Sequence, residues 1–232
     1  MSLTVERLSL STGGATRILL NRPDKANAYT REMLDVLSEA IESCLDPVLI
    51  LGAAGQGAFC AGADLNAMKH AKAEDALDLR SQQVFEQLAS FPGVSIAAIA
   101  GAAVAGGLEL TLACDLRVAG PLAIFRLPET GLGLIPAAGG CSRLPGIIGL
   151  GRAKEMVLLG TTLSAANALD WGLVNAVHAD PMALALQWAE KLGERDPLAL
   201  RLAKSVLDPQ LTESLNKERL SEAILYGRKE SQ

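Results

Sequence analysis

Aromatic residues, clustered positive charge and long apolar runs are all scarce in this sequence of 232 residues. Aromatics make up 3% of a chain that is 50% hydrophobic, so we expect Ala, Leu, Val and Ile to build the core. The 21 Lys and Arg are scattered among 26 Asp and Glu, and the net charge of -5 argues against a nucleic-acid partner. The length suits one large domain, or one domain with an appendage.

No apolar stretch is long enough to predict a membrane span. The most apolar segment, "GVSIAAIAGAAVAGGL", is shorter than the roughly 18–20 residues that a spanning helix needs, and Glu109 follows it directly. Near the N-terminus, Glu6 and Arg7 interrupt any signal-peptide core. We therefore expect a soluble protein with no membrane partner.

Residues for metal, redox and nucleotide chemistry are also few. The four cysteines form no C-x-x-C pair, and the two histidines, His70 and His178, have no cysteine at ligand spacing. We expect reduced thiols, a cytoplasmic location and no metal. The sequence has no G-x-S-x-G elbow, P-loop lysine or G-x-G-x-x-G spacing, so a dinucleotide oxidoreductase is an alternative with little support.

Short apolar strands and glycine-rich connections alternate with helical patterns along most of the chain. This order predicts an α/β fold in which residues 1–177 form a core of strand–strand–helix turns and residues 178–232 form a helical region. Thr30 is the predicted N-cap of one helix, with Met33, Leu34, Leu37 and Ile41 at helical spacing. The predicted strands are 5–11, 16–21, 47–53, 93–101, 115–120 and 122–128, and the predicted helices are 75–88, 182–192, 198–206 and those beginning at Thr30, at Gly106 and within 134–145.

Two loops of small residues each follow a predicted buried strand. Gly106 and Gly107 would open a helix, so their amides would be free at its positive end. The segment "CAGAD" places Ala61, Gly62 and Ala63 after another strand. Two such amides that converge on one oxygen would form an oxyanion hole, where each donor is worth roughly 3 kcal/mol. The alternative is that the small residues only allow a helix and a strand to pack closely.

Two glutamates stand in apolar surroundings. Glu109 lies among leucines in the first turn of its predicted helix, and Glu129 follows Pro128 after a second apolar run. If they are desolvated and close, one carboxyl can take a proton from water while the other donates a proton to carbon. Alternatively, Glu109 is an ordinary first-turn acid favoured by the helix dipole and Glu129 an ordinary loop residue.

Five segments resemble, in order, the signature blocks of the enoyl-CoA hydratase/isomerase (crotonase) superfamily. They cover nearly everything from Asn21 to Asp180: "NRPDKANAYT", "GAFCAGADL", "GAAVAGGLELTLACDLRVAG", "FRLPETGLGLIPAAGGCSRLP" and "GLVNAVHAD". The resemblance implies a spiral of β-β-α turns with a C-terminal helical trimerisation region. It also implies an acyl-CoA substrate, no cofactor beyond the CoA of that substrate, and a homotrimer or hexamer.

The resemblance also implies roles for individual residues. The backbone N–H groups of Ala63 and Gly106 are expected to bind the thioester oxygen, and Glu109 and Glu129 match the pair that adds water across the 2,3 double bond. In one departure from the family pattern, Ala105 stands where the first of three glycines is common. The residues expected to bind the substrate and its CoA are Lys25, Ala26, Ala28, Ala61, Ala63, Asp64, Leu65 and Gly106, and Arg22 and Lys25 are candidates for the CoA phosphates.

The expected activity is therefore that of an enoyl-CoA hydratase, a lyase of fatty acid metabolism. The nearest alternative is an enoyl-CoA delta-isomerase or another crotonase-fold acyl-CoA enzyme, since isomerisation needs only one well-placed acid. A non-catalytic CoA-binding or scaffolding subunit is the second alternative. The sequence end "YGRKESQ", which comes before the family's usual last helix, favours it.

Overall fold

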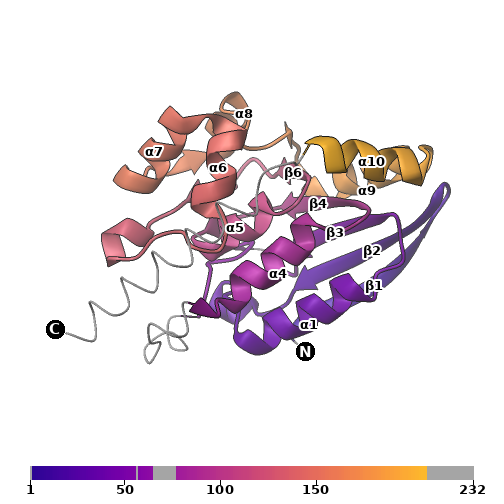
Figure 1. Ribbon diagram of the computed structural model, residues 1–232, viewed down its shortest axis with the longest axis horizontal. Coiled ribbons are helices and arrows are strands. Elements are labelled where there is room, and N and C mark those ends of the chain that lie inside the picture. The colour runs from indigo at the N-terminus through magenta and orange to yellow at the C-terminus, as the bar shows by residue number, and fades with distance from the viewer. Residues whose placement is uncertain (1, 56, 65–76, 208–232) are drawn as a thin grey trace.

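A large and a small β-sheet are wound from successive turns of the chain in the computed structural model, which describes residues 2–55, 57–64 and 77–207 (Figure 1). Within these residues the large sheet has six strands in the order β1-β2-β3-β4-β6-β9, with β1 and β2 antiparallel and the other neighbours parallel. The strands of this sheet are β1 (Leu3–Leu10), β2 (Gly13–Leu20), β3 (Val48–Ala53), β4 (Val94–Ile99), β6 (Leu116–Ala119) and β9 (Ala176–Val177). The small sheet joins β5 (Ala103–Val104), β7 (Ile124–Arg126) and β8 (Leu163–Ser164).

Helices follow the strands in a repeating order. β4, β5 and α5 form one turn, and β6, β7 and α6 form another, so each turn contributes one strand to each sheet and then a helix. This order confirms the predicted α/β spiral. The helical elements are η1 (Pro23–Lys25), α1 (Arg31–Glu42), α4 (Arg80–Ala89), α5 (Gly106–Leu112), η2 (Glu129–Leu132), α6 (Gly140–Ile148), α7 (Leu150–Leu159), α8 (Ala165–Asp170), α9 (Pro181–Gly193) and α10 (Pro197–Leu207). No described helix has the length and apolarity needed to cross a bilayer.

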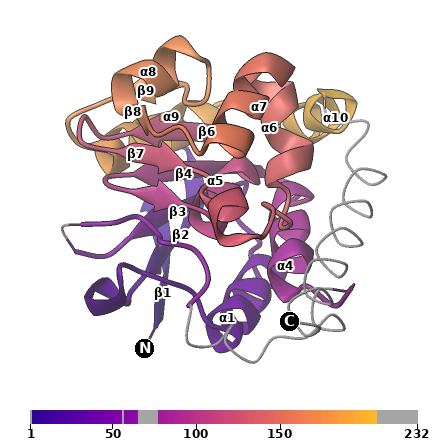
Figure 2. The same cartoon turned by 90° about the vertical axis from the view of Figure 1, so that its left-hand side faces the viewer.

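Both faces of the large sheet are covered, which explains why β3 is apolar along its whole length. In β3, Leu49 and Leu51 join the core cluster that contains α1, α4 and α5, whereas Val48 and Ile50 join a second cluster with α9. Successive side chains of a strand point to opposite faces, so a strand between two layers must be apolar at every position. Figure 2 shows α1 and α4 beside the strands and α9 behind the upper strands.

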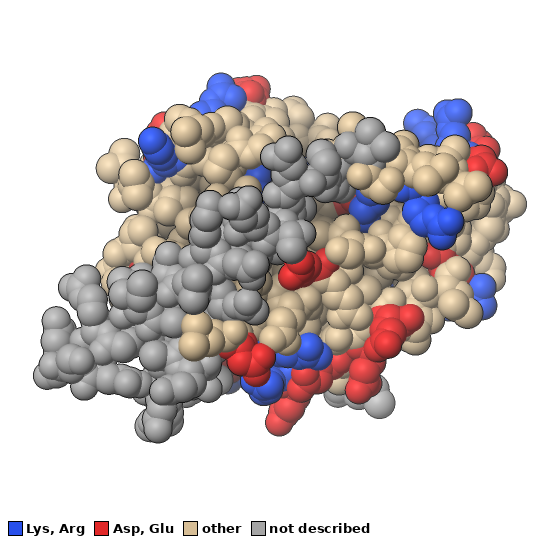
Figure 3. Space-filling model, viewed as in Figure 1, with Lys and Arg blue, Asp and Glu red and all other residues tan. Residues whose placement is uncertain are grey.

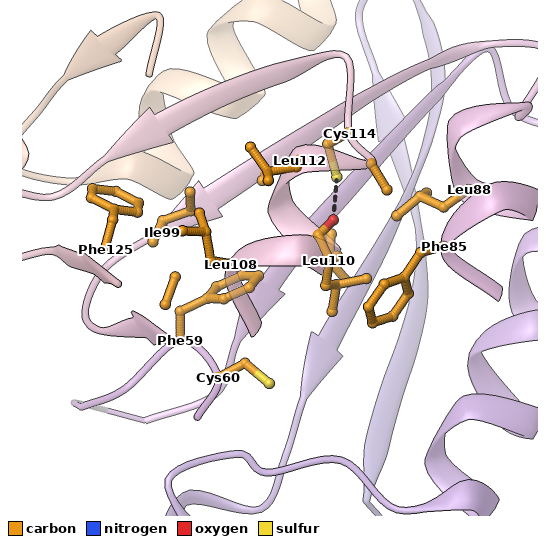
Figure 4. Packing of buried hydrophobic residues seen from close by; sticks show 14 of the residues in the cluster. Phe59, Cys60, Phe85, Leu88, Ile99, Leu108, Leu110, Leu112, Cys114 and Phe125 are labelled. Atoms are coloured by element: carbon orange, nitrogen blue, oxygen red, sulfur yellow. Dashed lines mark hydrogen bonds between the residues drawn. The ribbon is translucent and has the colours of Figure 1, made fainter. Parts of the chain in front are cut away.

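α5 lies in the centre of the molecule and is buried at every position. Its leucines 108, 110 and 112 spread among apolar side chains from other segments (Figure 4). A helix that is apolar all round is stable only inside a core, and this one carries Glu109 in its first turn. The neighbours that Figure 4 labels are Phe59, Cys60, Phe85, Leu88, Ile99, Cys114 and Phe125.

Several predicted elements match the structure closely. Thr30 caps α1 by accepting a hydrogen bond from the N–H of Met33 at 3.3 Å, and the four apolar positions of that helix are buried. The helix predicted over 75–88 is α4, Arg80–Ala89, and residues 75 and 76 lie outside the described part of the chain. The sequence patterns missed α7, β8, α8 and β9, which are short or weakly patterned.

The predicted C-terminal helical region begins with a helix that belongs to the main core. α9 packs on β2, β3, β4 and β6 through Ala185 and Ala189, which are fully or almost fully buried. Its N-terminus is capped by Asp180, which accepts from the N–H of Ala183 at 3.0 Å. The sheet face that α9 covers would otherwise expose apolar side chains to water.

Candidate active site

The segment from Cys60 to Asp64 is held on both sides by backbone hydrogen bonds. On one side Cys60 forms a parallel β-bridge with Ala103, and on the other side Ala63 forms a parallel β-bridge with Tyr29. The N–H of Tyr29 donates to the carbonyl of Gly62 at 2.8 Å, and the N–H of Asp64 donates to the carbonyl of Tyr29 at 2.9 Å. Because peptide groups alternate in an extended chain, the N–H of Ala63 points away from Tyr29. No acceptor among the described residues takes it.

The start of α5 lies against this segment. A Cβ built on Gly62 would lie 3.1 Å from the nitrogen of Gly106 and 3.0 Å from the Cβ of Ala105. The N–H groups of Gly106 and Gly107 open the helix and have no described acceptor. Ala105 has φ 52° and ψ -132°, a conformation that favours glycine. The structure therefore brings the amides of Ala63 and Gly106 onto adjacent loops.

The two glycines at this helix start pack against different neighbours. A Cβ on Gly107 would lie 2.0 Å from the carbonyl oxygen of Cys60, so close packing requires glycine there. A Cβ on Gly106 would lie 2.1 Å from the hydroxyl oxygen of Tyr29. Close packing therefore requires glycine at both positions, against the main chain of Cys60 for Gly107 and against the buried side chain of Tyr29 for Gly106.

Glu109 is buried and held from the start of α6. The residue is 3% exposed, and its Oε1 accepts hydrogen bonds from the N–H groups of Ala138 and Gly140, each at 2.8 Å. Gly139 between them has a positive φ of 114°, which lets the chain turn so that both amides face one oxygen. Two N–H donors on one oxygen favour the ionised carboxylate.

Glu129 is buried at the start of a different element. It begins η2 and is 8% exposed, and the hydroxyl of Thr130 donates to the carbonyl of Val157 at 2.8 Å, which ties η2 to α7. Burial, then Glu109, Cys60 and Glu129, raise the pKa of Tyr29 well above its usual value.

The residues predicted to bind CoA gather around a strained turn. Ala26 and Asn27 have positive φ values of 49° and 54°, and the N–H of Ala61 donates to the carbonyl of Ala26 at 3.0 Å. The guanidinium of Arg22 donates to the carbonyl of Ala28 at 2.6 Å and pairs with Asp64 at 3.1 Å. Arg22 thus holds this turn against the loop that contains Ala63.

The remaining predicted site residues are placed as follows. Lys25 is exposed at the end of η1, and Leu65 lies outside the described residues. The sequence patterns missed Tyr29, although one signal was available. It is one of only two tyrosines in the chain and stands between Ala28, expected to bind CoA, and the cap Thr30.

The described residues offer no strong ionic or metal site. Among them no group of three His, Cys, Asp or Glu side chains is arranged so that it could hold a metal ion. On the face shown in Figure 3, basic and acidic side chains lie near one another in small groups, and neither sign dominates. The site is therefore built from backbone amides, two carboxylates and a phenol.

Comparison with known proteins agrees with this architecture. Residues 11–232 match the family model described as enoyl-CoA hydratase/isomerase. The chain is 39% identical over 218 residues to the human enoyl-CoA hydratase domain-containing protein 2, mitochondrial, covering 89% of this chain and 75% of that protein. It is 33% identical over 204 residues to the short-chain-enoyl-CoA hydratase of Clostridium acetobutylicum, covering 84% and 78%.

A solved structure extends the likeness to the whole fold. The crystal structure of an enoyl-CoA hydratase from Bacillus anthracis superposes with a TM-score of 0.82 at 36% identity, covering 97% of this chain and 90% of that one. The fold is that of the crotonase enzymes. The chain belongs to the enoyl-CoA hydratase/isomerase family.

Proposed function

We propose that this protein is an enoyl-CoA hydratase, which adds water across the 2,3 double bond of a 2-enoyl-CoA thioester. One arrangement carries the proposal: two buried carboxylates, Glu109 of α5 and Glu129 of η2, together with the amides of Ala63 and Gly106 on neighbouring segments. Hydration needs both of these features. A pair of acids must move protons, and amide donors must bear the charge that develops on the thioester.

The thioester oxygen would accept hydrogen bonds from the N–H groups of Ala63 and Gly106. When water attacks C3, the electron pair of the double bond moves towards C2 and the carbonyl, and negative charge collects on this oxygen. Each preorganised amide then stabilises the transition state by roughly 3 kcal/mol. Neither amide has a described acceptor, so neither would have to give up an internal hydrogen bond.

The two glutamates would move the protons. Glu109 accepts two backbone N–H bonds, which favours its ionised form, so it is assigned as the base that takes a proton from water. The oxygen of that water bonds to C3. Glu129, in its protonated form, delivers a proton to C2. Transfer of the proton from Glu109 to Glu129 then restores both groups.

The CoA part would lie along the turn around Ala26. Lys25, Ala26, Ala28, Ala61, Asp64 and Leu65 are proposed to contact it, largely through backbone atoms. Because Arg22 is engaged with Asp64 and Ala28, the exposed Lys25 is the better candidate for a phosphate. A homotrimer or hexamer, a cytoplasmic location and the lack of any cofactor beyond the CoA of the substrate remain predictions.

Replacing each glutamate by glutamine tests the proposal. Glu109→Gln keeps an oxygen that can accept from Ala138 and Gly140 but cannot take a proton, and Glu129→Gln cannot deliver one. We expect each variant to lose about 10²–10⁴-fold in kcat, measured by loss of the enoyl-thioester absorbance of crotonyl-CoA. Calorimetric binding of the acyl-CoA should survive. Glu155→Gln, on the exposed side of α7, is the matched control and should be fully active.

The same assay separates the alternatives. Full hydration by both active-site variants would contradict the proposal. Conversion of a 3-enoyl-CoA to the conjugated product without hydration would identify an isomerase. Binding of acyl-CoA with no reaction at any chain length would instead identify a non-catalytic subunit.

A further inference from the structure

Gln82 is a buried amide on the otherwise apolar side of α4. The residue is 3% exposed, and the helix buries Val84, Phe85 and Leu88 beside it. A buried amide is costly unless it is hydrogen-bonded. The Nε2 of Gln82 donates to the carbonyl of Ala137 at 2.8 Å, on the turn that leads into α6 and lies 55 residues further along the chain.

The carbonyl that Gln82 binds belongs to the same peptide group as an N–H that holds the proposed base. The peptide between Ala137 and Ala138 accepts from Gln82 through its oxygen, and through its nitrogen it donates to Oε1 of Glu109, also at 2.8 Å. The side-chain amide, the peptide and the carboxylate thus form one continuous series of hydrogen bonds. In such a series each bond polarises the next, which strengthens it by about 10–30%.

The other side of the same turn is held from α6. Arg143, which is 5% exposed, donates from Nη1 to the carbonyl of Ala138 at 3.1 Å. A Cβ on Gly139 would lie 1.7 Å from that nitrogen, so the guanidinium lies directly against the turn. Arg143 therefore fixes the turn through the following peptide group, whereas Gln82 acts on the peptide group that itself donates to Glu109.

We propose that Gln82 is a positioning residue for the general base: its amide aligns and polarises the peptide between Ala137 and Ala138, whose N–H then holds Oε1 of Glu109 in place as a carboxylate. This inference rests on the proposed hydratase function. A base that is held in one orientation needs little rearrangement when it takes a proton from water. Gln82 itself moves no proton.

Gln82→Met removes the donor and keeps a side chain of similar length. We expect kcat for crotonyl-CoA hydration to fall about threefold to tenfold, the value of one hydrogen bond, while KM changes little. We also expect the acidic limb of the pH–rate profile to move to higher pH, because a less polarised N–H stabilises the carboxylate of Glu109 less. Gln83→Met is the matched control, since it makes the same change one position along α4, where the amide donates to Asp78 at 2.6 Å instead.

The charges around Glu109 are the same in wild type and in both variants. α4, α6 and β5 pack on α5, and Tyr29 and Cys60 touch its first turn. The two methionine variants replace neither these two residues nor Glu129. They also keep the charged or titratable side chains of α4 and α6, which are Arg80, Glu86, Cys141 and Arg143. A moved limb therefore reports the hydrogen bond and not an altered charge.

NMR of the wild type tests the series without a variant and without turnover. The carboxyl carbon of Glu109 gives the midpoint pH of its titration, and its signal is assigned by its absence in Glu109→Gln. We expect the side-chain amide of Gln82 and the N–H of Ala138 to shift with that same midpoint, and to lose this response in Glu109→Gln. An inactive wild type would refute the hydratase, while this shared midpoint would still support the role of Gln82.

Three results would overturn the assignment. The first is an unchanged kcat and acidic limb in Gln82→Met. The second is a loss of activity that only follows a lower melting temperature, with the limb in place, since a structural role alone would produce it. The third is a side-chain amide of Gln82 that does not respond when Glu109 titrates.

Discussion

A methyl group at Gly107 would force the two halves of the proposed oxyanion hole apart. The Cβ of Gly107→Ala would lie 2.0 Å from the carbonyl oxygen of Cys60, 2.7 Å from its carbon and 2.8 Å from its Cβ. Ordinary contacts are about 3.5 Å, so α5 or the loop must move by about 1 Å or more. Overpacking of this kind lowers the free energy of unfolding by about 1–3 kcal/mol. Replacing a helical glycine by alanine raises it by about 0.5–1 kcal/mol, which offsets part of that loss.

The consequence for activity should exceed the consequence for stability. A displacement of about 1 Å in a preorganised site can lower the rate about 10²-fold. Urea unfolding and crotonyl-CoA hydration would measure the two effects separately. Gly146→Ala and Gly151→Ala add the same atoms where a Cβ meets nothing within 4 Å, and each should be neutral or slightly stabilising. A Gly107→Ala protein as stable and as active as these controls would refute the packing argument.

Three further predictions concern strain, an ion pair and buried thiols. Ala105→Gly should raise the free energy of unfolding by about 1 kcal/mol in urea titrations, because it relieves a positive φ. Lys204→Met should lower it by about 3 kcal/mol and the melting temperature by about 6–12 °C, because it leaves the half-buried Asp115 without a cation that lies 2.9 Å away. Burial raises the pKa of Cys60 and of Cys114 to about 12. Above about pH 9 the unfolded chain therefore binds fewer protons than the folded protein, and the free energy of unfolding should fall as the pH rises. The slope is up to about 1.4 kcal/mol per pH unit for each thiol, and the folded protein should leave both unmodified by thiol reagents at pH 8.

Periodicity located the elements that have a strong pattern of their own. The helix α1 could be placed from Thr30 and four apolar positions because its capping and its buried stripe are both local properties. The strands β3 and β4 were found as unbroken apolar runs, since both faces of the large sheet are covered. The short strands β8 and β9, at two residues each, carry no such signal and form only because other strands are already in place.

The candidate site could be predicted as a set of residue types but not as an arrangement. Glu109 and Glu129 stood out because carboxylates in apolar surroundings are costly to bury without a purpose. Glu109 accepts hydrogen bonds from two N–H groups at the start of α6. This contact depends on a turn that lies 29 residues further along the chain. No local pattern reports a contact of that kind.

The sequence by itself determined the α/β class, the place of the strongly patterned strands and helices, and a family resemblance that the comparisons confirm. Only the tertiary structure decided that Gly107 serves packing, that Arg22 holds Asp64, and that the hydroxyl of Tyr29 lies against Gly106. The physical reason is the distance along the chain over which each effect acts. Hydrophobic period and capping act within a few turns of chain, whereas burial, electrostatic influence and close approach depend on segments that meet only after folding.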